Sequence, residues 1–242
     1  MSALLSVNGV SKRFRGLVAV DRASFAVPEG GVFAVIGPNG AGKTTLFNMI
    51  AGVFRPDAGT IAFAGERIDG LPPDRICRRG IGRTFQIVRP FAGLSVEDNV
   101  IVGALLHRHH VVDARSYAHE VLRRLDLYDK RERRASSLTL PDRKRLEVAR
   151  SLATDPKLLL LDEAMAGLRP TEMDRMVAIL RELNRETGLT ILLIEHVMRA
   201  VMALASHILV LHHGAAIAQG LPDDVVRNPA VIHSYLGAED VA

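Results

Sequence analysis

Cysteine and aromatic residues are scarce in this sequence. Its 242 residues include one cysteine, Cys77, so neither an internal disulfide nor a cysteine metal cluster can form. Tryptophan is absent and aromatic residues make up 5% of the chain, which argues against stacking surfaces for single-stranded nucleic acid. We therefore expect no nucleic-acid partner.

Long hydrophobic runs are also missing. No uncharged apolar stretch approaches the roughly 18 residues of a membrane span, and the best candidate, 197–211, contains Arg199 and His207. The first residues lack the basic and apolar regions of a signal peptide, so we expect a soluble, intracellular chain. The net charge of +4 suits a solvated surface or a position near an anionic membrane leaflet.

The remaining composition is that of a globular protein, with 48% hydrophobic and 24% charged residues. No internal repeat or low-complexity segment appears, so we expect residues 1–242 to form a single domain. Residues 4–27 alternate loosely between apolar and polar, which predicts two or three short antiparallel strands.

Apolar periodicity predicts an inserted helical subdomain at about residues 88–155. One helix face is formed by Ala114, Tyr117, Ala118, Val121, Leu122 and Leu125. Ser95 has the chemistry of an N-cap for a second helix, and residues 146–153 form part of a third. Further along, Thr171 is expected to cap a helix that Gly188 ends.

A glycine-rich loop, Gly37–Thr45, follows the apolar run 32–36 and precedes a helical pattern. This context identifies the G-x-x-x-x-G-K-[ST] pattern as a phosphate-binding loop, whose inward N–H groups and helix start attract anions. Lys43 is expected to reach the β- and γ-phosphates of a bound nucleotide, and the Thr44 hydroxyl to bind Mg²⁺. The other expected nucleotide contacts in the loop are Asn39, Gly40, Ala41, Gly42 and Thr45.

Two further apolar runs, 158–161 and 191–194, read as buried strands that end in polar residues. Asp162 and Glu163 follow the first run, and His196 lies just beyond the second. Open parallel sheets bind ligands at the carboxyl ends of their strands. If these strands are parallel neighbours, one edge of the sheet collects Lys43, Thr44 and these three side chains.

Each of these groups has a task in phosphoryl transfer, which depends on positioning and charge compensation. Asp162 is expected to hold Mg²⁺, and Glu163 to polarise an attacking water as general base. His196 can hydrogen-bond the γ-phosphate, and Gln86 at a strand end can reach the metal or the water. Adjacent carboxylates favour hydrolysis over a kinase reaction, which needs an acceptor site.

Nearly the whole chain resembles the ATP-binding subunits of ABC transporters. Phe14 matches the adenine-stacking aromatic, and Val20, at the end of the similar stretch Phe14–Val20, is carried over as a further nucleotide contact. Gly37–Thr45 matches Walker A, and Gln86 matches the Q-loop. Leu158–Glu163 matches Walker B with its catalytic glutamate, and His196 matches the switch histidine.

Within that family the sequence is most similar to the branched-chain amino-acid importers. The similar stretches are Phe14–Val20, Arg83–Val100, Leu146–Arg150, Ala166–Glu172 and Asn228–Gly237. The resemblance implies an α/β fold, with a RecA-like P-loop NTPase core, an N-terminal antiparallel β-subdomain and an inserted helical subdomain.

It also implies hydrolysis of ATP with Mg²⁺ in a head-to-tail dimer. Membrane-spanning permease subunits would carry the dimer at the cytoplasmic face of the inner membrane, and a periplasmic solute-binding protein would take part indirectly. Each ATP would lie between the Walker motifs of one chain and the signature of the other.

The signature segment, Leu138–Asp142, departs from the family pattern Leu-Ser-Gly-Gly-Gln. Thr139 keeps a hydroxyl for the partner's ATP, whereas Pro141 has no N–H to donate. Asp142 adds a negative charge unless it points away, and Arg169 and Ala164 are smaller departures near Walker B. We therefore expect a competent Walker site and a weak signature, with homodimer and heterodimer both open.

Three other readings remain. A soluble ABC-type ATPase outside transport would usually carry tandem cassettes or a long coiled coil, which this chain lacks. A regulatory subunit with weak hydrolysis fits the altered signature but not Glu163 and His196. A P-loop kinase would need a lid or acceptor signature.

Overall fold

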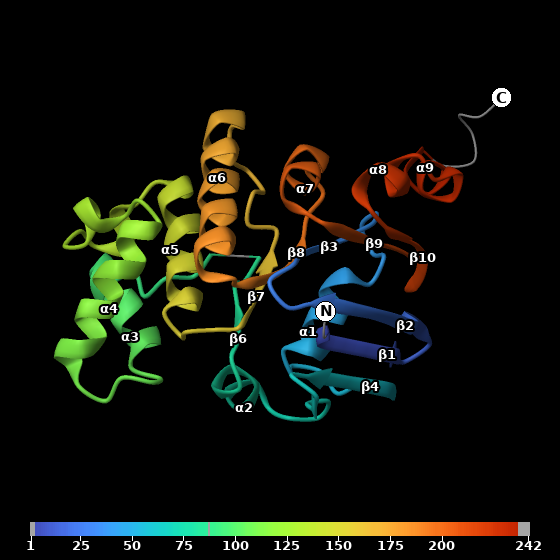
Figure 1. Cartoon of the computed structure of the whole chain (residues 1–242), viewed down its shortest axis with the longest axis horizontal. Coiled ribbons are helices and arrows are strands. Elements are labelled where there is room, and N and C mark those ends of the chain that lie inside the picture. The colour runs from blue at the N-terminus through green and yellow to red at the C-terminus, as the bar shows by residue number, and fades with distance from the viewer. Residues whose placement is uncertain (1–2, 87, 237–242) are drawn as a thin grey trace.

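The computed structural model describes residues 3–86 and 88–236, which form two β-sheets with helices around them (Figure 1). The strands are β1 (Ala3–Phe14), β2 (Leu17–Pro28), β3 (Val32–Ile36), β4 (Ala58–Phe63), β5 (Glu66–Arg67), β6 (Ile81–Arg83), β7 (Leu158–Asp162), β8 (Thr190–Ile194), β9 (His207–His212) and β10 (Ala215–Gly220). The α-helices are α1 (Lys43–Ile50), α2 (Pro73–Arg78), α3 (Val96–Ala104), α4 (Val111–Arg124), α5 (Leu140–Leu152), α6 (Pro170–Thr187), α7 (Met198–Leu204), α8 (Pro222–Val226) and α9 (Pro229–Leu236). Short 3₁₀ turns, η1 (Tyr128–Lys130) and η2 (Ala135–Ser137), precede α5.

The N-terminal sheet is antiparallel, with strand order β2-β1-β4-β5. Its first two strands are long, so the prediction of two or three short strands was wrong in their length. The register between β1 and β2 shifts at several points, including Val7 to Val10 around Gly9. A bulge bends a strand without ending it, and therefore the punctuation seen in the sequence did not mark strand ends.

The second sheet has the order β10-β9-β3-β8-β7-β6, and all its pairs are parallel except the closing β9–β10 hairpin. The predicted parallel arrangement is confirmed, because β8 lies between β3 and β7. Alternate residues of β3 belong to two different core clusters, Val32, Ala34 and Ile36 to one and Phe33 and Val35 to the other. Both faces of the sheet are therefore covered, which explains the uninterrupted apolar runs.

Helices α3, α4 and α5 gather at one end of the molecule, in the stretch of chain between the adjacent strands β6 and β7 (Figure 1). Ser95 caps α3 as predicted, and its Oγ accepts from the backbone N of Asp98 at 3.0 Å. Buried residues of these helices share one core cluster with the adjoining face of the large sheet.

Helix α6 begins earlier than predicted, with Arg169 as its N-cap and Thr171 inside the first turn. The expected capping role of Thr171 was wrong, because Pro170 suits the first helical position and moves the helix start forward. The Glu172 carboxylate accepts from the Arg169 N–H at 2.8 Å, and Gly188 ends the helix as predicted, with φ of 67°. Among the described residues, no helix has both the length and the apolar character needed to span a bilayer.

Candidate functional site

The phosphate loop connects β3 to α1 as the sequence predicts. Gly37 has φ of 146°, and a Cβ there would lie 2.1 Å from the Leu211 carbonyl oxygen, so this position requires glycine. Lys43 Nζ donates to the carbonyl oxygens of Gly37 and Pro38 at 2.7 and 2.9 Å. Burial lowers the pKa of Lys43, although Glu163 and Asp162 act in the opposite sense. The ammonium group is thus held inside the loop where phosphate would bind.

A cavity of about 510 Å³ opens beside this loop. It is lined by Phe14, Leu17, Val18, Ala19, Asn39, Gly40, Ala41, Gly42, Lys43, Thr44, Thr45, Gln86, Glu163 and His213. The Phe14 ring packs edge-on against Phe54, with centroids 5.1 Å apart, and is 38% exposed. The cavity can therefore take an aromatic base at Phe14 and phosphates at the glycine loop.

Val20 is placed differently from the expectation, because it lies outside this lining and is fully buried. Its Cγ2 would be 3.3 Å from a Cβ at Gly42, so Val20 packs against the backbone of the phosphate loop. The neighbouring residues of β2 and His213 line the cavity instead. The β2 residues belong to the similar stretch Phe14–Val20, whereas no motif marked His213, since its position depends on the approach of the β9–β10 turn.

Asp162 ends β7 with its side chain only 1% exposed. The guanidinium of Arg83 on β6 lies 3.3 Å from Asp162 Oδ2, and also donates to Asn48 Oδ1 at 2.6 Å. Burial raises the pKa of Asp162, and Arg83 partly offsets this shift. Arg83 was missed as a site residue, although a lone arginine in the apolar segment that precedes Gln86 was the available signal.

Glu163 follows Asp162 in the left-handed region, with φ of 51°. One of its carboxylate oxygens, Oε2, accepts from Gln86 Nε2 at 2.7 Å and lies 3.5 Å from His196 Nε2. The three residues follow the ends of β6, β7 and β8, so the sheet edge brings Glu163 and His196 together as expected, and Gln86 joins them. A carboxylate held by an amide and an imidazole can orient a water molecule for attack on phosphorus.

The oxygen groups beside the loop fit a hard divalent cation. Thr44, Gln86 and Asp162 line a second cavity of about 460 Å³, together with Phe85 and the arginines Arg83, Arg89 and Arg150. Within the described part of the chain, Asp162 Oδ1 is buried without a hydrogen-bond partner. Hydroxyl, amide and carboxylate oxygens are the ligands that Mg²⁺ uses in proteins.

The signature segment lies at the start of α5. Asp142 turns inward, where it accepts hydrogen bonds from Lys130 at 2.5 Å, Arg145 at 2.6 Å and the Thr139 hydroxyl at 2.9 Å. Although burial acts the other way, these bonds hold the pKa of Asp142 below its usual value. The Asp142 charge is therefore neutralised within the chain, and the Thr139 hydroxyl is engaged by the same carboxylate.

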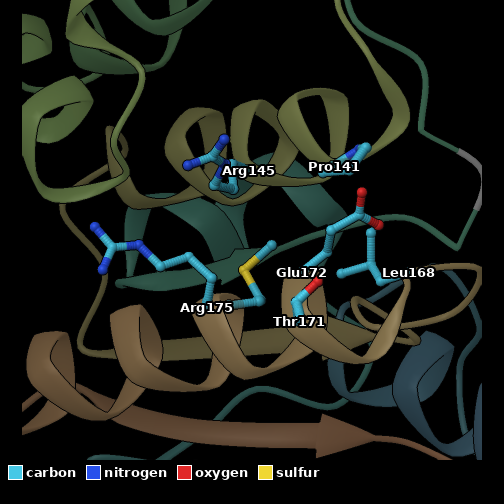
Figure 2. Close-up of a pocket in the computed structure, with 7 residues that line it drawn as sticks. Pro141, Arg145, Leu168, Thr171, Glu172 and Arg175 are labelled. Carbon is cyan, nitrogen blue, oxygen red and sulfur yellow. The ribbon is translucent and has the colours of Figure 1, made fainter.

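A cavity of about 210 Å³ separates the start of α5 from α6 (Figure 2). Pro141 and Arg145 lie on the α5 side, and Thr171, Glu172 and Arg175 on the α6 side. Leu140 is 46% exposed at the helix start, and its Cδ2 would be 3.4 Å from a Cβ at Gly167. The side chains of Leu140 and Pro141 thus occupy surface that the two glycines of the family pattern would leave open.

Two buried charged residues near Glu163 escaped the sequence analysis. Lys144 on α5 donates from Nζ to the Glu163 carbonyl oxygen at 2.8 Å. Glu195 directly follows β8 and accepts from the Met165 N–H at 2.9 Å. Lys144 belongs to the charged run 142–145, which looks like a solvated helix face, so only the fold reveals its burial.

Comparisons with known proteins agree with these features. Residues 20–166 match the family model for ABC transporters, and residues 217–241 match that for the branched-chain amino acid ATP-binding cassette transporter. The chain is 40% identical to the high-affinity branched-chain amino acid transport ATP-binding proteins BraF of Pseudomonas aeruginosa and LivG of Escherichia coli. Both alignments cover 97% of this chain and 98% of the relative.

Solved structures show the same fold. A nucleotide-free ATP-binding cassette from an ABC transporter superposes with a TM-score of 0.89 at 29% identity, covering 98% of this chain and 100% of the other. The ADP conformation of the cassette MJ1267 gives a TM-score of 0.89 at 30% identity with the same coverage. The similarities favour the transporter subunit over the soluble alternative. The chain belongs to the ABC transporter family, as one of its ATP-binding cassette ATPases.

Proposed function

We propose that this chain hydrolyses ATP to power an importer of branched-chain or related amino acids. The observation that carries the proposal is the meeting of Gln86, Glu163 and His196 beside the Lys43 loop at one sheet edge. Relatives named for branched-chain amino acid transport, and the matching C-terminal segment, support the cargo class. That segment begins in β10 and continues beyond the described residues, as does the similar stretch ending at Gly237.

In the proposed reaction, the loop N–H groups and Lys43 bind the phosphates while Phe14 supports the adenine. Glu163 accepts a proton from the attacking water, and Gln86 orients its carboxylate through the 2.7 Å hydrogen bond. His196, 3.5 Å from the same oxygen, is placed to hydrogen-bond the γ-phosphate. Charge compensation and positioning are the main contributions that phosphoryl transfer requires.

Thr44, Asp162 and Gln86 are the residues proposed to hold Mg²⁺. The free Oδ1 of Asp162 and the shared cavity support this assignment. A cation held by these residues would supply positive charge to compensate that of the phosphates. Burial raises the pKa of Asp162, and the neighbouring Arg83 partly offsets this shift and so favours the ionised carboxylate as a ligand.

We further propose a head-to-tail dimer on membrane-spanning permease subunits at the cytoplasmic face of the inner membrane. A periplasmic solute-binding protein would deliver the cargo. The partner cassette is a second, different chain, because this chain offers a poor signature. Pro141 cannot donate an N–H and Thr139 is already bonded to Asp142.

The test compares steady-state ATP turnover of the isolated chain with that of the chain reconstituted with its second cassette. We expect the pair to be faster, since an intact signature completes the Lys43 site. If the isolated chain and the pair hydrolyse ATP at equal rates, the proposal that the partner cassette is a different chain fails. In the pair, Glu163→Gln should bind ATP and lower turnover roughly 100-fold or more, while unchanged turnover would exclude Glu163 as general base.

The cargo class is tested by uptake of radiolabelled leucine, valine and glutamine in cells that lack the chain. Reintroduction of the chain should restore uptake of a branched-chain or related amino acid, and Glu163→Gln should not. If uptake of none of these amino acids is restored, the proposed cargo is contradicted, while the proposed ATPase chemistry is unaffected.

A further inference from the structure

The loop after β7 is held by two buried side chains of opposite charge. Lys144 is 6% exposed and Glu195 fully buried. Lys144 Nζ binds the carbonyl oxygen of Glu163 at 2.8 Å, while Glu195 Oε1 binds the N–H of Met165 at 2.9 Å. The Lys144 ammonium on the carbonyl and the Glu195 carboxyl group on the N–H therefore hold the short segment that begins with the proposed general base.

These charges are unusual because burial of an ammonium and a carboxylate is costly. Burial lowers the pKa of Lys144 and raises that of Glu195, and each charge favours the ionised form of the other. Within the described residues, Glu195 Oε2 has no hydrogen-bond partner. An apolar pair would fill the same space, so packing alone does not account for two charged groups bonded to one loop.

The backbone at Glu163 is the feature that these bonds act on. With φ of 51°, Glu163 lies in a region that non-glycine residues rarely adopt. The hydrogen bond from Lys144 fixes the orientation of the peptide group that follows Glu163. The direction of the Glu163 carboxylate toward Gln86 depends on that backbone.

Lys144 connects this loop to the helix that carries the signature segment. Thr139 caps α5, and Lys144 follows five residues later, roughly 7 Å along the helix axis. Further along α5, the Ser151 hydroxyl donates to the Arg83 carbonyl oxygen at 2.6 Å. A shift of the start of α5 therefore reaches the Glu163 backbone through a single side chain.

We propose that Lys144 is a positioning residue for Glu163, which ties the signature helix of this chain to its own general base. A displacement of the start of α5 would then change the direction of the Glu163 carboxylate in the same chain. The inference rests on the proposed role of Glu163 as general base. Glu195 holds the far side of the same loop and stabilises the ammonium.

The experiment measures kcat and KM for ATP with the full-length chain in its transporter complex. The variants are Lys144→Met, Lys144→Arg, Glu163→Gln and the double variant Lys144→Met/Glu163→Gln. Arg181→Met is the matched control, because Arg181 also donates from one element to a backbone carbonyl, that of Ala203 at 2.6 Å, but away from the site.

We expect Lys144→Met to lower kcat about tenfold or more with KM within about twofold, as loss of positioning predicts. Lys144→Arg should recover most of the turnover, Arg181→Met should resemble the parent chain, and the double variant should be no slower than Glu163→Gln. If Lys144→Met does not melt cooperatively, Lys144→Gln, whose amide is too short to reach the carbonyl, takes its place.

Two results would overturn the inference. If Glu163→Gln is inactive while the Lys144 variant matches Arg181→Met, Lys144 has no positioning role and the proposed function stands. If Glu163→Gln keeps the parent turnover, the general-base assignment fails and the inference fails with it.

Discussion

Glu195 lies at the end of β8 with its carboxylate fully buried, and burial raises its pKa to about 7. In the unfolded chain the same group ionises near its ordinary value of 4.5. The folded state therefore loses stability as the pH rises from about 4.5 to 7, and the full penalty is present above that range.

We expect Glu195→Gln to raise the melting temperature at pH 8 and to change it little at pH 5. The shift in pKa corresponds to about 3 kcal/mol at most, and the glutamine oxygen can still accept from the Met165 N–H. Thermal melts at the two pH values measure the effect. Glu120→Gln, on the exposed face of α4, controls for loss of one negative charge, and an equal gain at both pH values would contradict the prediction.

Asp142 offers a second test at the residue scale, since three side chains donate to its buried carboxylate. Asp142→Ala should lower the free energy of unfolding by about 2–3 kcal/mol, because Lys130 loses its carboxylate partner and Arg145 keeps only Asp126, at 3.6 Å. Urea denaturation measures this loss. Asp129→Ala, at an exposed position in the 3₁₀ turn η1, is the control and should cost little. Similar costs for both variants would show that the Asp142 network adds no stability.

At the scale of single elements, the two ends of helix α6 can be tested separately, at Thr171 near its start and at Gly188 at its end. Thr171 lies inside its first turn, so Thr171→Ala should change the free energy of unfolding by less than about 0.5 kcal/mol. Gly188 ends the helix at φ of 67°, so Gly188→Ala should cost about 1 kcal/mol. Denaturant unfolding of both variants measures the two costs. If Thr171→Ala lowers the free energy of unfolding more than Gly188→Ala does, Thr171 is the cap after all.

Helix α5 carries the prediction for the signature. Pro141→Ala restores a backbone N–H near the start of the helix, where the partner's phosphates are proposed to lie. One charge-assisted hydrogen bond is worth about 1.5–3 kcal/mol, so the ATP affinity of the assembled pair should rise about tenfold or more. Equilibrium ATP binding measures the change.

Pro170→Ala is the matched control, because Pro170 also lies in the first turn of a helix, in this case α6. It should leave the ATP affinity unaltered. If the two proline variants bind ATP equally well, the missing N–H at Pro141 does not limit the signature.

At the scale of the whole molecule, sequence reasoning anticipated the parallel sheet, the phosphate loop and the cluster of groups at its edge. These features were predictable because they follow from local runs of apolar residues and from the rule that strand ends share an edge. The lengths of β1 and β2 were not predictable, since bulges leave no clear mark. Lys144, Arg83 and Val20 were misjudged or missed because burial depends on contacts distant in sequence.

The pairing of β3 has a consequence for synthesis of the chain. The phosphate-loop strand Val32–Ile36 is fully buried, but its two neighbours are β8 and β9, which begin at Thr190 and His207. Ribosomes add about 5–20 residues per second, so this apolar strand waits roughly 8 to 30 seconds for its first sheet partner to be made. During that interval the nascent chain exposes an apolar strand that lacks its sheet partners and can associate with other chains. The strand that leads into the phosphate loop is therefore a segment to be protected before synthesis is complete.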